Sequence, residues 1–118
     1  MFSVRVESVF SSAHNLRGYK GKCEALHGHN WKVEAIVSSE KLDPAGMVID
    51  FTVVKKELNA VLNNFDHAYL NKVKPFTTLN PTSENIARFV YGRLKKKIPG
   101  LSSVTVWESA TSCATYHE

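Results

Sequence analysis

Apolar and polar residues alternate in two early stretches of the chain, which predicts two half-buried strands. Residues 2–7 and 31–38 each place apolar side chains at every second position. These side chains are Phe2, Val4, Val6, Trp31, Val33, Ala35 and Val37. The segment between the strands, roughly residues 12 to 28, has no such period. Irregular connections of this length are usually functional in compact domains.

Two later segments have apolar residues at helical spacing, and two short strands follow them. The first helix is expected over about residues 51 to 64 and the second over about residues 81 to 97, where a helix-start motif opens the segment and three lysines end it. Strands around residues 104–106 and 114–116 complete the order ββααββ. This order predicts an α+β fold, an antiparallel sheet with two helices on one face, and its open edges favour oligomerisation.

Composition and charge narrow the classes of function. The 118 residues suit one domain, residues 1–118, with a formal net charge of +4 and a pI near 9.1. The basic residues are scattered, so we expect no nucleic-acid partner. Neither a long apolar run nor a signal-peptide pattern is present, so we expect a cytoplasmic protein without a membrane span, in which Cys23 and Cys113 are free thiols.

Three histidines near the facing ends of the first two strands form a candidate metal site. His27 and His29 are two residues apart, so both rings point to one side of an extended chain. His14 would lie opposite them if the strands pair as a hairpin. Three imidazoles with a fourth position open are typical of catalytic zinc. The alternative is a pair of partly exposed strand-end histidines that bind nothing.

Cys23 precedes this pattern in the motif CEALHGH. Beside a metal ion, the pKa of its thiol would be lowered, which would make it a base or nucleophile near neutral pH. Two alternatives stay open. Cys23 could be a fourth ligand that closes a structural zinc site in a non-enzymatic binding module, or it could be an inert buried cysteine.

Two more acidic positions are candidates for the site. Asp66 precedes His67, and a carboxylate beside an imidazole could orient it and raise its basicity. A turn role for Asp66 with a surface His67 is the alternative. Glu108 follows an apolar strand, where acids are rarely buried unless paired. It could accept hydrogen bonds from a guanidine-like ring edge, or remain an exposed strand residue.

Six short motifs together resemble the 6-pyruvoyltetrahydropterin synthase / 6-carboxytetrahydropterin synthase family. In chain order they are SSAHNL, CEALHGHNWKV, GMVIDF, DHAYLN, NPTSENIA and VWES. The resemblance implies the tunnelling fold, in which ββααββ subunits join their sheets into a barrel as a trimer. Two such trimers stack, so it implies a homohexamer.

The resemblance also implies roles for particular residues. It implies zinc on His14, His27 and His29, catalysis by Cys23, Asp66 and His67 assembled across a subunit interface, and pterin binding by Glu108 with Thr82, Ser83 and Glu84. The implied substrate is 7,8-dihydroneopterin triphosphate. From charge alone, the expected steering residues for its triphosphate are Arg17, Lys20 and Lys22.

The spacing around Cys23 distinguishes branches of this family. Cys-x3-His-Gly-His resembles the bacterial enzymes of queuosine synthesis, which form 6-carboxytetrahydropterin and acetaldehyde, whereas the biopterin-forming animal enzymes resemble Cys-x5-His-Gly-His. A third branch, tied to folate synthesis, resembles Glu-x2-His-Gly-His, a spacing that Glu24 satisfies. We therefore expect a 6-carboxytetrahydropterin synthase. The alternatives are a 6-pyruvoyltetrahydropterin synthase, or a dual activity that uses Glu24 as a second base and also releases 6-hydroxymethyl-7,8-dihydropterin. Another enzyme of the same fold, such as a dihydroneopterin aldolase or a cyclohydrolase relative, is a further rival.

Overall fold

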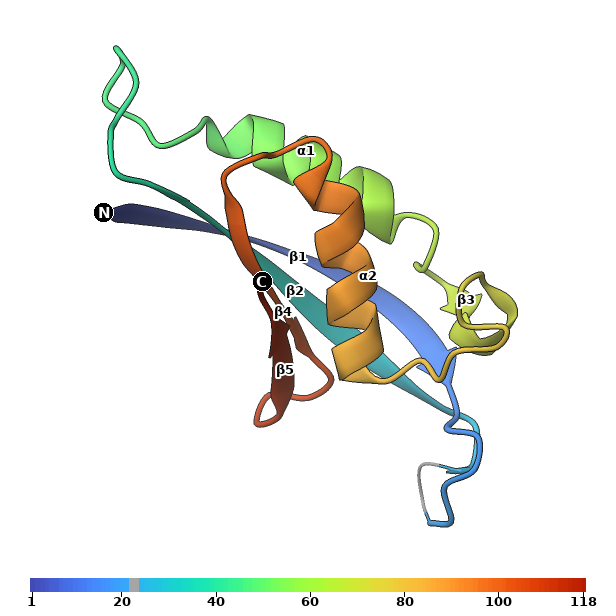
Figure 1. Cartoon of the computed structure of the whole chain (residues 1–118). Coiled ribbons are helices and arrows are strands. Elements are labelled where there is room, and N and C mark those ends of the chain that lie inside the picture. The colour runs from blue at the N-terminus through green and yellow to red at the C-terminus, as the bar shows by residue number, and fades with distance from the viewer. Residues whose placement is uncertain (22–23) are drawn as a thin grey trace.

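Two long paired strands form the centre of the sheet. The computed structural model describes residues 1–21 and 24–118. In it, β1 (Phe2–His14) and β2 (His27–Ser39) pair antiparallel along their whole length (Figure 1). The connection was expected over residues 12 to 28, but it spans only 15–26. The pairing of β1 with β2 continues through the histidine motif. Most side chains there are polar, so the alternation of apolar and polar residues that predicts a strand is absent from the sequence.

Three shorter strands complete the sheet. β4 (Leu101–Trp107) pairs antiparallel with β2, and β5 (Cys113–Tyr116) pairs antiparallel with β4. β3 (Ala68–Tyr69) runs parallel to the end of β1 and leads into a 3₁₀ turn at Leu70–Lys72. The strand order is β3-β1-β2-β4-β5. The predicted α+β fold is confirmed, whereas β3 was not predicted, because two residues carry no measurable period.

Both helices lie on the same face of this sheet (Figure 1). α1 (Phe51–Leu62) begins where the side chain of Asp50 accepts a hydrogen bond from the Thr52 N–H. α2 (Ser83–Lys95) begins in the same way at Thr82, whose hydroxyl accepts from the Asn85 N–H. Each helix ends two residues before its predicted end. None of the helices in the described ranges is long and apolar enough to cross a membrane.

The core lies between the helices and the inward residues of the strands. Phe10 and Trp31 face each other across β1 and β2, and their rings stack with centroids 5.7 Å apart. The helices contribute Val54, Leu58, Leu62, Ile86, Val90 and Leu94. The molecule is elongated, about 52 Å by 23 Å by 22 Å. Because the long strands extend past both helices, the ends of β1 and β2 are left uncovered by them (Figure 1).

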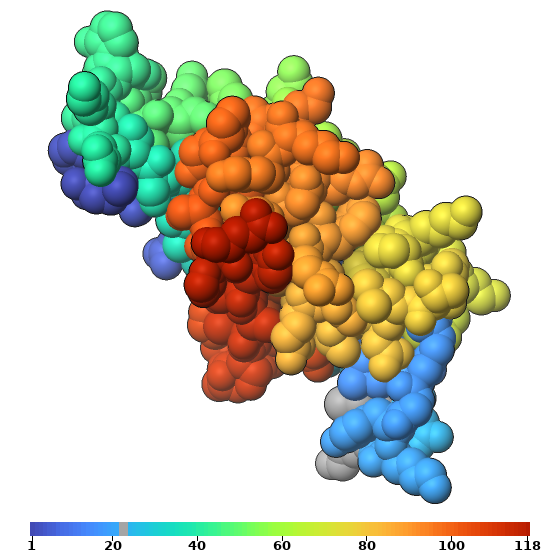
Figure 2. Space-filling view, in the orientation of Figure 1, coloured from blue at the N-terminus to red at the C-terminus, as the bar shows by residue number. Residues whose placement is uncertain are grey.

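At one end of the molecule, the connection after β1 projects beyond the sheet and packs beside the segment that follows β3 (Figure 2). Arg17 holds these two segments together. Its guanidinium donates to the carbonyls of Asn71, Phe76 and Leu79, and the Asn80 side chain exchanges two hydrogen bonds with the Arg17 backbone. Three main-chain oxygens accept hydrogen bonds from its guanidinium, so Arg17 has a structural role here, and its expected steering of a triphosphate stays a prediction. Lys20 is exposed, and Lys22 lies outside the described residues.

Replacing Leu58 by Ala should destabilise the protein by about 2–5 kcal/mol, because the side chain is 0% exposed and its removal leaves a cavity between α1 and the sheet. Urea unfolding at one fixed protein concentration measures the loss. Val53→Ala, on the same helix at 46% exposure, is the control and should change the free energy of unfolding by less than about 0.5 kcal/mol. Equal losses in the two variants would contradict this packing.

Candidate metal centre and its surroundings

The inward stripe of the two long strands ends in histidines. Side chains of β1 and β2 alternate between the two faces, so His14 lies on the face that carries Phe10, and His27 and His29 lie on the face that carries Trp31. Both strands turn these residues toward the helix side. His14 pairs with His27 in the ladder, which confirms the predicted hairpin. The three rings therefore form a polar continuation of the core.

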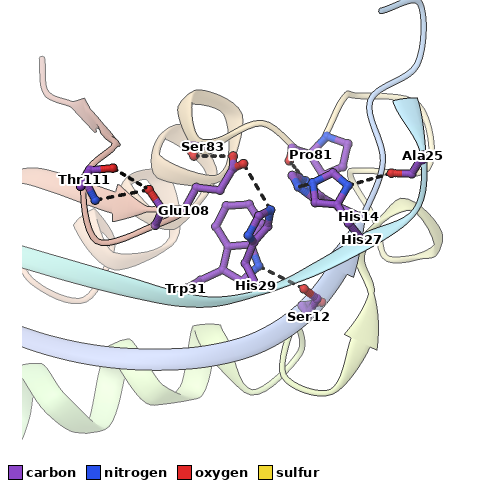
Figure 3. Close-up of polar contacts among 11 residues, drawn as sticks. Ser12, His14, Ala25, His27, His29, Trp31, Pro81, Ser83, Glu108 and Thr111 are labelled. Carbon is purple, nitrogen blue, oxygen red and sulfur yellow. Dashed lines mark hydrogen bonds and ion pairs between the residues drawn. The ribbon is translucent and has the colours of Figure 1, made fainter. Parts of the chain in front are cut away.

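Glu108 joins the three histidines from the neighbouring strand. It follows the buried Val106 at the end of β4, and its N–H donates to the Ser112 carbonyl. One carboxylate oxygen, Oε1, lies 3.2 Å from His29 Nε2 (Figure 3). One ligand atom from each of the four side chains lies within 4.8 Å of the others. From the sequence, Glu108 was expected to accept hydrogen bonds from the guanidine-like edge of a bound ring. Its contact with the histidines was not predicted, because the pairing of β2 with β4 leaves no local pattern in the sequence.

Two backbone carbonyls fix the orientation of the histidine rings. Nδ1 of His14 lies 2.8 Å from the Pro81 oxygen, and Nδ1 of His27 lies 2.7 Å from the Ala25 oxygen (Figure 3). A carbonyl oxygen only accepts, so each Nδ1 carries the proton, and in the neutral ring Nε2 keeps its lone pair. The two Nε2 atoms lie 3.0 Å apart. Two lone pairs this close repel each other unless a cation lies between them.

The surroundings favour a metal ion over a proton as that cation. Burial lowers the pKa of His14, and the two neighbouring histidines lower it further, against the raising effects of the Pro81 carbonyl and Glu108. Burial also lowers the pKa of His29. Among the described side chains, His29 Nε2 is a buried nitrogen without a well-formed hydrogen bond. Three imidazole nitrogens and one carboxylate match the ligand types of zinc and similar divalent ions, so the cluster fits a metal.

The pair Asp66 and His67 lies apart from this cluster, at the outer edge of β1. Asp66 accepts a hydrogen bond from the Ser11 N–H at 2.9 Å, which lowers the pKa of its carboxyl, and it lies 3.1 Å from His67 Nδ1. These adjacent residues meet because His67 has a φ of 53°. The His67 side chain is 83% exposed. The interaction between Asp66 and His67 is therefore formed, but within one chain neither residue belongs to the group of three histidines and Glu108.

A hollow of about 320 Å³ opens beside Glu108, between the start of α2 and the turn after β4. Ser83 and Glu84 line it, and the Ser83 hydroxyl lies 3.5 Å from the second oxygen of Glu108, Oε2. Thr82 does not line the hollow but caps α2. Glu108 thus lies between the hollow and the three histidines.

The two candidate bases lie on the connection between β1 and β2. Glu24 is exposed, and its N–H donates to the Gly21 carbonyl. Cys23 lies outside the described residues, so its predicted role is a matter for experiment.

Comparisons with known proteins identify the family of the chain. The family model described as 6-pyruvoyl tetrahydropterin synthase matches residues 3–118. A "6-carboxy-5,6,7,8-tetrahydropterin synthase" of Synechocystis sp. is 39% identical over 98% of this chain and 93% of its own length. A "Dihydroneopterin monophosphate aldolase" of Pyrococcus furiosus is 39% identical over 72% of each chain.

A solved structure shows the same fold. The 6-pyruvoyl tetrahydropterin synthase of Caenorhabditis elegans superposes with a TM-score of 0.91 at 33% identity, over 99% of this chain and 95% of that one. The recognised resemblance and the tunnelling-fold architecture of the subunit are thereby confirmed, and a binding module without catalysis is excluded. The chain belongs to the 6-pyruvoyl tetrahydropterin synthase family and is an enzyme of that family.

Proposed function

We propose that this enzyme is a zinc-dependent 6-carboxy-5,6,7,8-tetrahydropterin synthase of queuosine biosynthesis. It converts 7,8-dihydroneopterin triphosphate and one water molecule to 6-carboxytetrahydropterin, acetaldehyde and triphosphate. The observation that carries the proposal is the convergence of three histidine side chains beside the hollow at Glu108. The name of the Synechocystis relative and the Cys-x3-His-Gly-His spacing support this branch of the family.

The proposed metal ligands are His14, His27 and His29. Bound zinc would supply a Lewis acid for the hydroxyls of the substrate side chain. The chain prepares for this role by holding Nδ1 of His14 and of His27 on backbone carbonyls, which leaves both Nε2 lone pairs free for the ion. His29 contributes a buried nitrogen that lacks another well-formed partner in the described structure.

The proposed ring site is the hollow at the start of α2. Glu108 accepts hydrogen bonds from two N–H groups on the guanidine-like edge of the pterin, and Ser83 and Glu84 line the space around it. A carboxylate suits this edge because both of its oxygens can accept. Thr82 acts indirectly, since its side chain fixes the first turn of α2 from which Ser83 projects.

The proposed proton transfers use Cys23 and His67. The Cys23 thiolate takes the proton that leaves carbon, and His67 serves as the complementary acid or base. Asp66 faces Nδ1 of His67, so Nε2 is the atom that exchanges the proton with the substrate. Because His67 lies outside the cluster of its own chain, it would act on a substrate bound by a neighbouring subunit.

The sheet edges support such an assembly. β1 pairs with β3 only at Ser12 and Ala13, so in the described structure most of its outer edge lacks a strand partner. β5 forms the opposite edge. Joining these edges between copies would close the sheets into a barrel, and the proposed form is a homohexamer of two stacked trimers.

A second candidate function is favoured by one observation, the exposure of Glu24, which follows Cys23 directly in the sequence. The Pyrococcus relative is named as an aldolase, which supports retro-aldol chemistry on a dihydroneopterin as a second reaction. A dual activity would then also release 6-hydroxymethyl-7,8-dihydropterin. The formation of 6-pyruvoyltetrahydropterin is the other alternative, supported by the name of the Caenorhabditis structure.

Incubation with 7,8-dihydroneopterin triphosphate should yield 6-carboxytetrahydropterin and acetaldehyde, identified by mass. Cys23→Ala should abolish this product, because the thiolate no longer removes the proton. If Glu24 is a second base, 6-hydroxymethyl-7,8-dihydropterin survives in Cys23→Ala and disappears in Glu24→Ala. Loss of both products in Cys23→Ala with neither lost in Glu24→Ala would exclude the dual activity. A wild-type product of 6-pyruvoyltetrahydropterin would refute the proposed branch.

His14→Ala should lose most bound zinc and nearly all activity, because it removes the one proposed ligand that β1 supplies. Zinc per protomer by elemental analysis and turnover of the triphosphate measure the two losses. His117→Ala, at an exposed histidine near the end of the chain, is the matched control and should keep its zinc. Full zinc occupancy in His14→Ala would refute His14 as a zinc ligand.

Two inactive variants should restore each other's activity if the site is shared between subunits. In mixed oligomers of Cys23→Ala and His67→Ala, about a quarter of the sites would combine an intact Cys23 with an intact partner His67, assuming random assembly and one contribution from each of two subunits. The rate after co-expression, relative to each variant alone, measures this recovery. No recovery in oligomers shown to be mixed would place both residues in one subunit.

A further inference from the structure

We propose that Glu108 exchanges between two partners. In the substrate-free enzyme its carboxylate is the fourth ligand of the metal, and it leaves the metal to accept the ring N–H groups when a pterin binds. This inference rests on the proposed function for the identity of the metal and of the ring. It assigns Glu108 a second role, one that regulates access to the ion.

The contacts of Glu108 point in two directions. Its Oε1 lies 3.2 Å from His29 Nε2, on the side of the histidine cluster, whereas its Oε2 lies 3.5 Å from the Ser83 hydroxyl, on the side of the hollow (Figure 3). The His29 nitrogen makes no well-formed hydrogen bond with this oxygen. The two atoms are thus placed as neighbouring ligands of one cation, and the carboxylate belongs to the group whose ligand atoms lie within 4.8 Å of one another.

The Glu108 side chain also has more conformational freedom than the rings of His14 and His27. The rings of His14 and His27 are held by backbone carbonyls, but the described structure gives the carboxylate only the contacts with His29 and Ser83. Its side chain is 31% exposed and reaches the site from the turn that follows β4. A glutamate has three rotatable bonds, so a change of rotamer can move its oxygens from the metal toward the hollow without backbone movement.

The exchange has a chemical advantage. Three histidines and one carboxylate fill a tetrahedral zinc site, whereas catalysis needs an open position. A pterin ring edge that offers two N–H donors competes for the same carboxylate and opens that position as it binds. A hydroxylated compound without such an edge leaves the carboxylate on the metal. Ring recognition would therefore control which molecules reach the ion.

Zinc affinity of the substrate-free enzyme tests the first half of the proposal. Glu108→Gln should weaken zinc binding by at least about tenfold in chelator competition, since loss of outer-sphere partners alone costs about 10–100-fold. Glu108→Asp keeps the charge but shortens the reach, so it should lose affinity as well. Glu84→Gln removes the same charge from the same hollow and should change affinity by less than about twofold, because Glu84 is outside the ligand group.

Two outcomes of this measurement would overturn the proposal. Unchanged zinc affinity in Glu108→Gln would show that the carboxylate serves the ring alone. Equal losses in Glu108→Gln and Glu84→Gln would show a long-range effect of charge instead of ligation. The unfolding midpoint of each metal-free variant, compared with that of the wild type, separates loss of a ligand from loss of the fold.

The second half is tested with the Co²⁺-substituted enzyme and a pterin that lacks the 6-side chain, so that the probe offers the ring edge but no hydroxyls for the metal. Adding this probe should change the visible Co²⁺ spectrum of the wild type, because a carboxylate leaves the ion, and should leave the spectrum of Glu108→Gln unchanged. Saturation of the wild type, followed by pterin fluorescence, with no spectral change would overturn the exchange. A wild-type protein that binds no zinc, binds no pterin or fails to convert the triphosphate would refute the proposed function itself. The two failures are therefore distinguishable.

Discussion

The in-register pairing of β1 and β2 is the constraint on which the rest of the site depends. This pairing sets His14 opposite His27 and Ser12 opposite His29, so one face of a two-stranded ladder carries all three rings. A slip of one residue would turn one strand's histidines to the other face and would also expose its core residues. On the same face, Phe10 lies two inward positions beyond His14, and Trp31 lies one beyond His29. Burial of these two rings therefore stabilises the position of the three histidines as well as the core. The hydrophobic effect that folds the sheet therefore also positions the three histidines.

The rest of the site comes from elements that are far from the histidines in the sequence and close to them in the folded chain. Glu108 arrives from β4 because β4 pairs with β2, and Pro81 arrives from the segment before α2. That segment is held against the end of β1 by the hydrogen bonds of Arg17 and by Asn71, whose side-chain amide exchanges two hydrogen bonds with the Asn15 backbone. Arg17, one of the basic residues expected to steer a triphosphate, thus also stabilises the histidine end of the sheet. Its charge is balanced by the partial negative charges of three carbonyl oxygens, in a part of the fold with little regular secondary structure.

Much of this arrangement could be predicted from local pattern. Alternation located the strands, spacing located the helices, and the separation of His27 from His29 predicted that they share a face. What could not be predicted was set by contacts between distant residues. The meeting of Glu108 with His29 depends on the order of strands in the sheet, and the contact between Asp66 and His67 depends on a left-handed backbone conformation that only the structure reveals. The helix ends were each placed two residues too far along, since apolar spacing continues into the turns that follow.

The oxygens that orient His14 and His27 belong to the main chain, at Pro81 and Ala25. A side-chain partner can be lost through a single codon change, but every residue type carries a carbonyl group. The support of these two rings is therefore resistant to point mutation and sensitive only to changes in the path of the backbone, such as an insertion between Asn80 and α2. Side chains that line the neighbouring hollow are free to vary while the histidine geometry persists. A scaffold of this kind can diverge in the molecules it accepts without first losing the geometry of its histidines.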